Sequence, residues 1–138
     1  MSQSKDETIA AIATKSLKEI SYHRRHSADW VIRLGDGTDE SHERMQKAID
    51  ELWGYTPEMF DMDELERAMV DKEIGADLAI LKPKWDVMIN RVLTEATLQR
   101  PEDTWEVRGS REGVHSEHLG FLLAEMQFLP RAYPEARW

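Results

Sequence analysis

Apolar residues in the first quarter of the chain recur at alternating steps of three and four residues, which predicts one long helix over residues 6–34. The stripe consists of Ile9, Ala13, Ile20, Trp30 and Leu34. Ser16, His23 and Ser27 fall on the same stripe, so we expect them to be buried polar groups with hydrogen-bond partners. Gly35 and Gly37 then predict a helix end followed by a tight reversal.

A second amphipathic helix is predicted over residues 39–56, capped by Thr38 or Asp39 and with Glu40 near the positive end of its dipole. Its inner face consists of Met45, Ile49, Leu52, Trp53 and Thr56. Pro57 bends or ends it, because proline lacks an amide hydrogen. Two helices joined by so short a link should lie antiparallel, as half of a four-helix bundle.

The remaining segments are shorter. Residues 63–72 predict an acidic helix, residues 75–81 a connector, and Pro83 the first turn of a helix that runs to Ala96. Residues 100–114 are charged and irregular, and Ser116 is expected to cap a last helix that ends at Pro130. The apolar side chains expected to face inward from that last helix are Leu119, Leu122, Leu123, Met126 and Leu129.

No alternating strand pattern interrupts these helices. We therefore expect an all-α fold, an incomplete ferritin-like bundle of about five helices in a single domain over residues 1–138.

Composition narrows the function. The chain has 18 Lys and Arg against 27 Asp and Glu, a net charge of -9 that repels a phosphate backbone, so no nucleic-acid partner is expected. It has no cysteine, which excludes disulfides and thiolate chemistry. Residues 1–7 lack a leader's apolar core, and no apolar run reaches the ~20 residues that span a bilayer. We expect a cytoplasmic protein without membrane contact.

Histidine and glutamate residues suggest a di-iron bundle, but too few are present. Such a bundle needs a glutamate from each of two helices and a Glu-x-x-His motif from each of the other two. The first predicted helix offers Glu19 and His23, whereas the middle of the second is apolar. His23 is more simply a hydrogen-bonded core histidine, and we expect no metal site.

The one literal Glu-x-x-His, Glu112 with His115, lies between Gly109 and the start of the last helix. His118 follows His115 at a spacing that could place both on one side. Capping or ordinary polar contacts are the simpler interpretation. The alternative, an independent ferritin-like metal oxidase, would use Glu19, His23, Glu112, His115 and His118. No phosphate-binding loop and no nucleophile paired with a base is present.

Several segments together resemble the C-type structural subunit of bacterial phenylacetyl-CoA epoxidase, a multicomponent ring-oxygenating monooxygenase. They are Lys18-Glu-Ile-Ser-Tyr-His-Arg-Arg-His, Trp30-Val-Ile-Arg-Leu-Gly-Asp-Gly-Thr-Asp, Met45-Gln-Lys-Ala-Ile, Leu52-Trp53, Gly113-Val-His-Ser-Glu-His-Leu-Gly and Leu123-Ala-Glu-Met-Gln. The resemblance spans nearly the whole chain but only the C-terminal part of a family member.

The resemblance implies a ferritin-like subunit with no working metal site and no catalysis of its own. It implies a catalytic A-type partner that holds the di-iron centre, and a CoA thioester near the interface. Arg67, Ala68 and Met69 are the positions that the resemblance brings close to the CoA thioester; Arg67 is also a cation suited to phosphate in an acidic segment.

The resemblance leaves about two long bundle helices outside this chain. Because one hairpin cannot bury both of its faces, we expect either a homodimer that completes a bundle or a partly open, sticky fold. A free-standing acyl-CoA binding helical module is a further alternative to the structural subunit.

Overall fold

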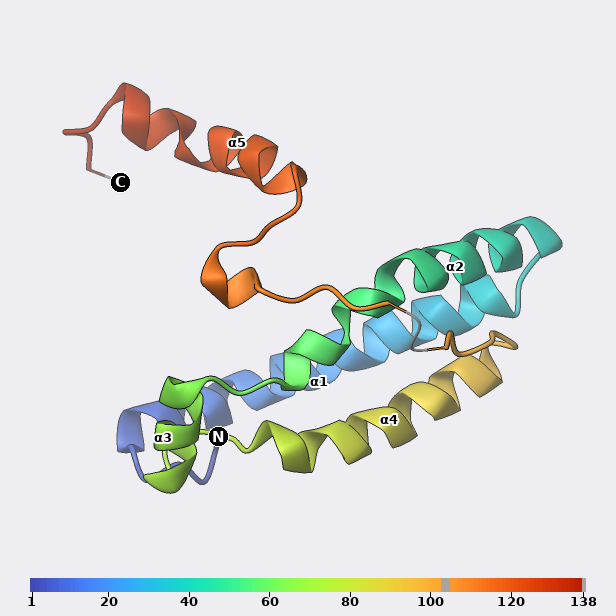
Figure 1. Ribbon diagram of the computed structural model, residues 1–138, viewed down its shortest axis with the longest axis horizontal. Coiled ribbons are helices and arrows are strands. Elements are labelled where there is room, and N and C mark those ends of the chain that lie inside the picture. Colours follow the sequence, from blue (N-terminus) through green and yellow to red (C-terminus); the bar gives the residue numbers. More distant parts are fainter. Residues whose placement is uncertain (103–104, 138) are drawn as a thin grey trace. The chain divides into compact units, whose positions relative to one another are not determined.

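The computed structural model describes residues 1–102 and 105–137, and in these ranges the chain is all α, as expected (Figure 1). Its helices group into two compact units, residues 1–107 and residues 108–138, which are described separately. The first unit contains α1 (Glu7–Gly35), α2 (Asp39–Leu52), α3 (Glu64–Asp71) and α4 (Leu78–Glu95). The second contains α5 (His118–Ala132).

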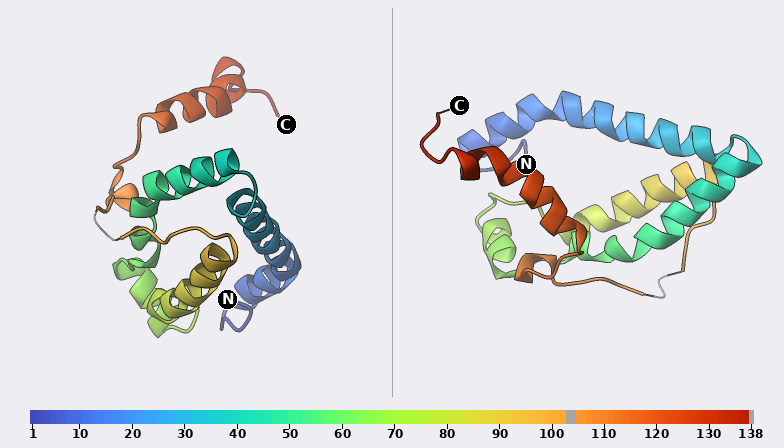
Figure 2. Two further views of the ribbon diagram at one scale, coloured as in Figure 1. Left: turned by 90° about the vertical axis from the view of Figure 1, so that its right-hand side faces the viewer. Right: turned by 90° about the horizontal axis from the view of Figure 1, so that it is seen from above.

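Helices α1 and α2 form the predicted hairpin, and their ends lie where the sequence places them. The Asp6 side chain accepts a hydrogen bond from the Ile9 amide at 2.9 Å, which starts α1. The Thr38 side chain accepts from the Ser41 amide at 3.2 Å and starts α2. Figure 2 shows the two helices joined by the tight turn and running back along each other.

The segment after α2 is tighter than an α-helix. The predicted helix to residue 56 ends at Leu52 and continues as two 3-10 turns, η1 (Trp53–Tyr55) and η2 (Pro57–Phe60). Pro57 starts the second turn, where a missing amide hydrogen leaves no helical bond unmade. Helix α3 follows with a full capping box, in which Asp63 and Glu66 each bond the other's backbone amide.

Helix α4 begins earlier than the sequence pattern indicates. The Asp77 side chain accepts from the Ala79 amide at 2.9 Å, so residues 78–81, expected to be a connector, form the first turn. Pro83 therefore lies inside the helix rather than in its first turn. That placement removes one helical hydrogen bond, because the carbonyl four residues earlier has no amide to accept from.

The core of the first unit lies where the end of α1, the end of α2 and the end of α4 meet. Its buried residues are Trp53, Leu93, Ala96 and Leu98, and Ala96 is fully buried. Partly buried side chains pack around them: Val31, Ile32, Met45, Ile49, Trp85 and Ile89. Gly35, buried on α1, faces Ala96 and Leu98 so closely that a side chain would have no room. The absence of a Cβ at Gly35 thus permits this crossing.

The two ends of α1 are held by different parts of the unit. At its start, the Lys5 amide donates to the Glu73 carbonyl at 2.9 Å and the Lys5 ammonium pairs with the Glu73 carboxylate at 2.8 Å. At its end it packs against α2 and α4. Between the two, Ile12, Leu17 and Ile20 remain about 60% exposed. The apolar stripe of α1 is therefore largely uncovered by the described chain.

The second unit consists of a short turn and one helix. The 3-10 turn η3 (Ser110–Glu112) is flanked by Gly109 and Gly113, both in the left-handed conformation with φ of 97° and 86°. Helix α5 starts at His118 after Glu117, with no side-chain cap, so the expected cap by Ser116 is wrong; the Ser116 carbonyl instead accepts from the Leu119 amide.

Pro130 lies inside α5 instead of ending it. The apolar side chains expected to face inward are mostly exposed in the described chain: Leu122, Leu123, Met126 and Leu129. The helix thus carries an apolar face that its own unit does not bury.

We predict that Gly35→Ala destabilises the protein by about 1–3 kcal/mol, because the added methyl would sit 2.8 Å from Leu98 Cδ1 and 2.9 Å from Ala96 Cβ. Gly120→Ala in α5 is the matched control, since its Cβ would meet nothing within 4 Å. Urea unfolding followed by circular dichroism should show a lower midpoint for the first variant and an equal or higher one for the second. Equal midpoints for both would contradict the tight crossing.

Candidate functional site

The first pair of candidate metal ligands lies on the exposed surface of α1. The His23 Nε2 atom is 3.8 Å from the Glu19 Oε1 atom, and the two side chains are 63% and 75% exposed. The expectation that His23 is a buried core histidine is therefore wrong, and Ser27 is exposed as well. The helices that pack on α1 reach only its C-terminal part, around Val31, Ile32 and Gly35, so nothing in the described chain covers His23.

The second candidate set lies in the other unit. Glu112 ends the turn η3, His115 lies in the following loop, and His118 is the first residue of α5; all three are exposed. Among residues 1–102 and 105–137, no group of three or more His, Asp and Glu side chains comes together in a way that could hold a metal ion. The structure thus assembles neither a di-iron donor set nor the three protein ligands of a catalytic zinc site within these ranges.

The three residues singled out for CoA contact lie on α3. Arg67 is exposed on this otherwise acidic helix, while Ala68 and Met69 are half-buried. The Met69 carbonyl accepts hydrogen bonds from the Ile74 and Gly75 amides, both at 2.9 Å, which closes the C-terminal end of the helix. The backbone at Ala68 and Met69 is therefore engaged in ending α3, and Arg67 is the one of the three that can reach a ligand by charge.

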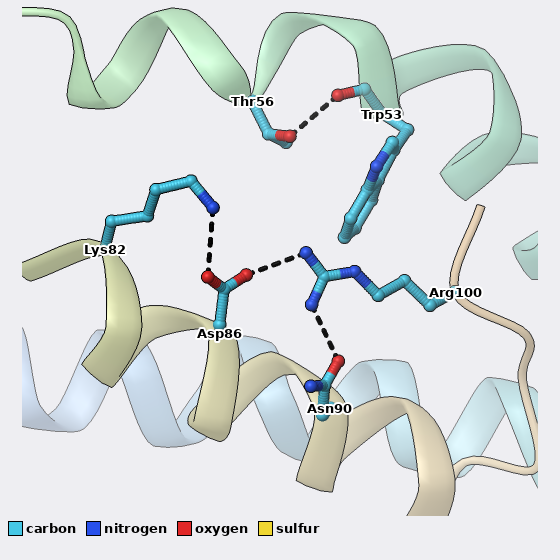
Figure 3. A network of polar contacts seen from close by, with 6 residues as sticks. All are labelled: Trp53, Thr56, Lys82, Asp86, Asn90 and Arg100. Carbon is cyan, nitrogen blue, oxygen red and sulfur yellow. Dashed lines mark hydrogen bonds and ion pairs between the residues drawn. The ribbon is translucent and has the colours of Figure 1, made fainter. Parts of the chain in front are cut away.

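A polar network that the sequence did not reveal lies beside the core (Figure 3). The Arg100 guanidinium donates from Nη2 to Asp86 Oδ1 at 2.7 Å and from Nη1 to Asn90 Oδ1 at 2.8 Å. The Lys82 ammonium donates to the other Asp86 oxygen at 3.0 Å. Lys82, Asp86 and Asn90 are spaced by four residues on α4, which places them on one face of the helix.

Aromatic rings enclose this network. The Trp85 ring lies 5.8 Å from the Trp53 ring and 5.3 Å from the Phe60 ring, measured between centroids. The Arg100 guanidinium lies over Trp53, 5.0 Å from the ring centroid, and within 6.0 Å of the Trp85 centroid. The adjoining cavity measures about 80 Å³, well below the ~300 Å³ at which ligand pockets begin. This cluster therefore fastens the segment after α4 to the core rather than binding a substrate.

The charges around Asp86 lower the pKa of its carboxyl below the usual 3.8. The hydrogen bond from Arg100 is the main cause and the one from Lys82 the second, because both stabilise the ionised carboxylate. The spacing of Lys82 and Asp86 along α4 could have suggested their pairing. The decisive partner, Arg100, comes from beyond the helix end, and no periodicity points to it.

No described helix is both long and apolar enough to cross a bilayer.

Comparison with known proteins agrees with this helical architecture. The sequence model of a family described as "Phenylacetic acid catabolic protein" matches residues 1–138. The chain belongs to this family. It is 43% identical over 136 residues to the C-type subunit of the 1,2-phenylacetyl-CoA epoxidase of Escherichia coli (strain K12), a match that covers 99% of the chain and 55% of that relative. The chain thus spans about half the length of the curated relative it matches.

The segments that resemble this phenylacetic acid catabolic family lie in both units. Residues 18–26 lie on the exposed middle of α1, and residues 30–39 form its end and the turn into α2. Residues 45–49 and Leu52 lie on α2, with Trp53 in the core. Residues 113–120 and 123–127 lie around the start and middle of α5. The first four of these segments thus form or adjoin the crossing of α1 and α2.

We predict that Asp86→Asn lowers the urea midpoint of unfolding at pH 7, because the neutral amide cannot pair with Arg100 and Lys82. The Asp86 carboxyl has a lowered pKa, so its stabilising effect is present above 3.8 and is lost as the pH falls through the lowered value. Wild type and variant should therefore converge below that range in tryptophan-monitored unfolding.

The matched control is Asp71→Asn, at the exposed end of α3, which should leave the free energy of unfolding within about 0.5 kcal/mol of wild type. A constant difference between wild type and Asp86→Asn at all pH values would contradict the role of the ion pair.

Proposed function

We propose that this chain acts as a structural, non-catalytic part of a phenylacetyl-CoA epoxidase and associates with a catalytic A-type subunit that holds the di-iron centre. The observation that carries the proposal is a sequence similar to the C-type subunit of such an enzyme, whose described residues do not assemble a metal-binding group. The donors present do not fit a di-iron site, because Glu19 and His23 lie exposed on one helix and the middle of α2 offers apolar side chains. No oxidation step is therefore assigned to this chain.

Exposed apolar surface in the first unit supports association with a partner. A groove of about 330 Å³ runs between α1, α2 and α4, and nearly every side chain lining it is apolar. It is lined by Val31, Met45, Ala48, Ile49, Leu52, Trp53, Thr56, Trp85, Ile89, Val92 and Leu93. A surface of this kind gains free energy when a partner's apolar side chains displace water from it. A second copy of this chain could use the same surface, which makes a homodimer the competing assembly.

The same proposal places a CoA thioester near the interface with the A-type subunit. Arg67 supports this placement, since its exposed guanidinium on an acidic helix can bind a phosphate by paired hydrogen bonds.

We predict that the chain co-purifies with a tagged A-type subunit of a phenylacetyl-CoA epoxidase when the two are expressed together. Ile49→Asp, which puts a charge on the groove wall, should abolish recovery, whereas Lys47→Asp on the outer face of α2 should leave it unchanged. Circular dichroism would confirm that both variants still fold. Recovery of neither wild type nor control would contradict the proposal, and light scattering of the chain alone would reveal the competing homodimer.

We also predict that the aerobically purified chain contains well below one iron atom per molecule by elemental analysis. The exposed pair Glu19 and His23 leaves most of an iron's coordination positions without protein ligands. Two iron atoms per chain, lost together in His23→Ala, would instead favour an independent metal oxidase.

A further inference from the structure

The positive charge of this acidic protein is concentrated on α1. Lys15, Lys18, Arg24, Arg25 and Arg33 all lie on this helix. Within residues 1–102 and 105–137, none of the five takes part in an ion pair, although the chain as a whole has 27 acidic residues against 18 basic ones. Cations elsewhere behave differently: Lys5, Arg44, Lys47, Lys82 and Arg100 each pair with a carboxylate.

Three of these cations share one face of α1 with a tyrosine. Lys15, Lys18, Tyr22 and Arg25 are spaced by three, four and three residues, so they form a continuous ridge about 15 Å long. We call these four residues the basic ridge. They line an open hollow of about 670 Å³, together with Glu19 and Ser21. That volume falls in the range of ~300–1,000 Å³ typical of small-molecule sites.

The basic ridge is separate from the apolar stripe of α1. Ile9, Ile20 and Leu34 lie on the stripe, more than ~100° around the helix from Lys18. A partner that covers the stripe therefore leaves the basic ridge open to solvent. The Tyr22 ring is 52% exposed, and the Arg25 guanidinium lies 5.8 Å from its centroid. An exposed ring held beside a cation offers a planar surface next to positive charge, the combination that binds nucleotides.

We propose that the basic ridge binds the nucleotide end of coenzyme A, with its three phosphates on Lys15, Lys18 and Arg25 and its adenine against Tyr22. The choice of ligand rests on the proposed function, since the matched relative is named for a CoA thioester. One group opposes the ligand: the Glu19 carboxylate lines the hollow, and it lies 3.8 Å from His23. The Ser21 hydroxyl is already used, donating to the Leu17 carbonyl at 2.7 Å.

Calorimetric titration of the full chain with coenzyme A at low salt tests this proposal. We expect saturable binding that weakens about tenfold in Lys18→Gln/Arg25→Gln and about fivefold in Tyr22→Leu. Glu19→Gln should tighten binding about twofold, because it removes a like charge from the site. The matched control, Arg44→Gln/Lys47→Gln, removes two cations that are ion-paired on α2 and should change the affinity less than twofold.

Several results would overturn the assignment: no saturable binding of coenzyme A, equal weakening in the α1 and α2 variants, or equal binding of phosphate-free pantetheine. A helical peptide rich in glutamate that binds more tightly than coenzyme A, and is lost in the same α1 variant, would assign the basic ridge to a protein partner. Co-purification of Lys18→Gln/Arg25→Gln with the A-type subunit keeps the two proposals apart. Recovery there with no binding of coenzyme A by the wild type would sink only the ligand site.

Discussion

The close crossing of Gly35 over Ala96 is the contact on which the first unit depends. Only a residue without a side chain lets the end of α1 approach the end of α4 so closely. The carbonyl of Gly35 then accepts hydrogen bonds from His42 Nδ1 at 2.7 Å and from Thr97 Oγ1 at 3.3 Å. These bonds tie the start of α2 and the residue after Ala96 to one backbone atom, so three elements meet at a single point.

The segment that follows α4 extends this junction by polar contacts rather than by burial. The Gln46 side chain brackets the backbone of Gln99, accepting from its amide at 2.8 Å and donating to its carbonyl at 3.0 Å. Arg100 then joins the α4 carboxylate to the ring of Trp53. Because only five apolar side chains in the described chain are buried, such directional contacts have an unusually large share in defining the fold.

Sequence reasoning succeeded where the signal is local and failed where it is not. Thr38, Gly35 and the predicted start at residue 6 mark helix ends correctly, because capping involves only neighbouring residues. Pro83 misled it, since a favourable cap at Asp77 outweighs one lost hydrogen bond. The exposure of His23 and the partnership of Asp86 with Arg100 depend on which elements pack together, which periodicity along a single helix does not specify.

The anchoring of α1 at its two ends has a consequence for how the molecule moves. Its first turn is held by the loop after α3 and its last turn by the junction at Gly35, while the span between has water on most of its sides. Amide protons near residues 14–24 should therefore exchange with deuterated solvent sooner than those at either extremity, the reverse of the fraying usual in helices. The strut would open first at its centre, where the lysines and arginines are displayed.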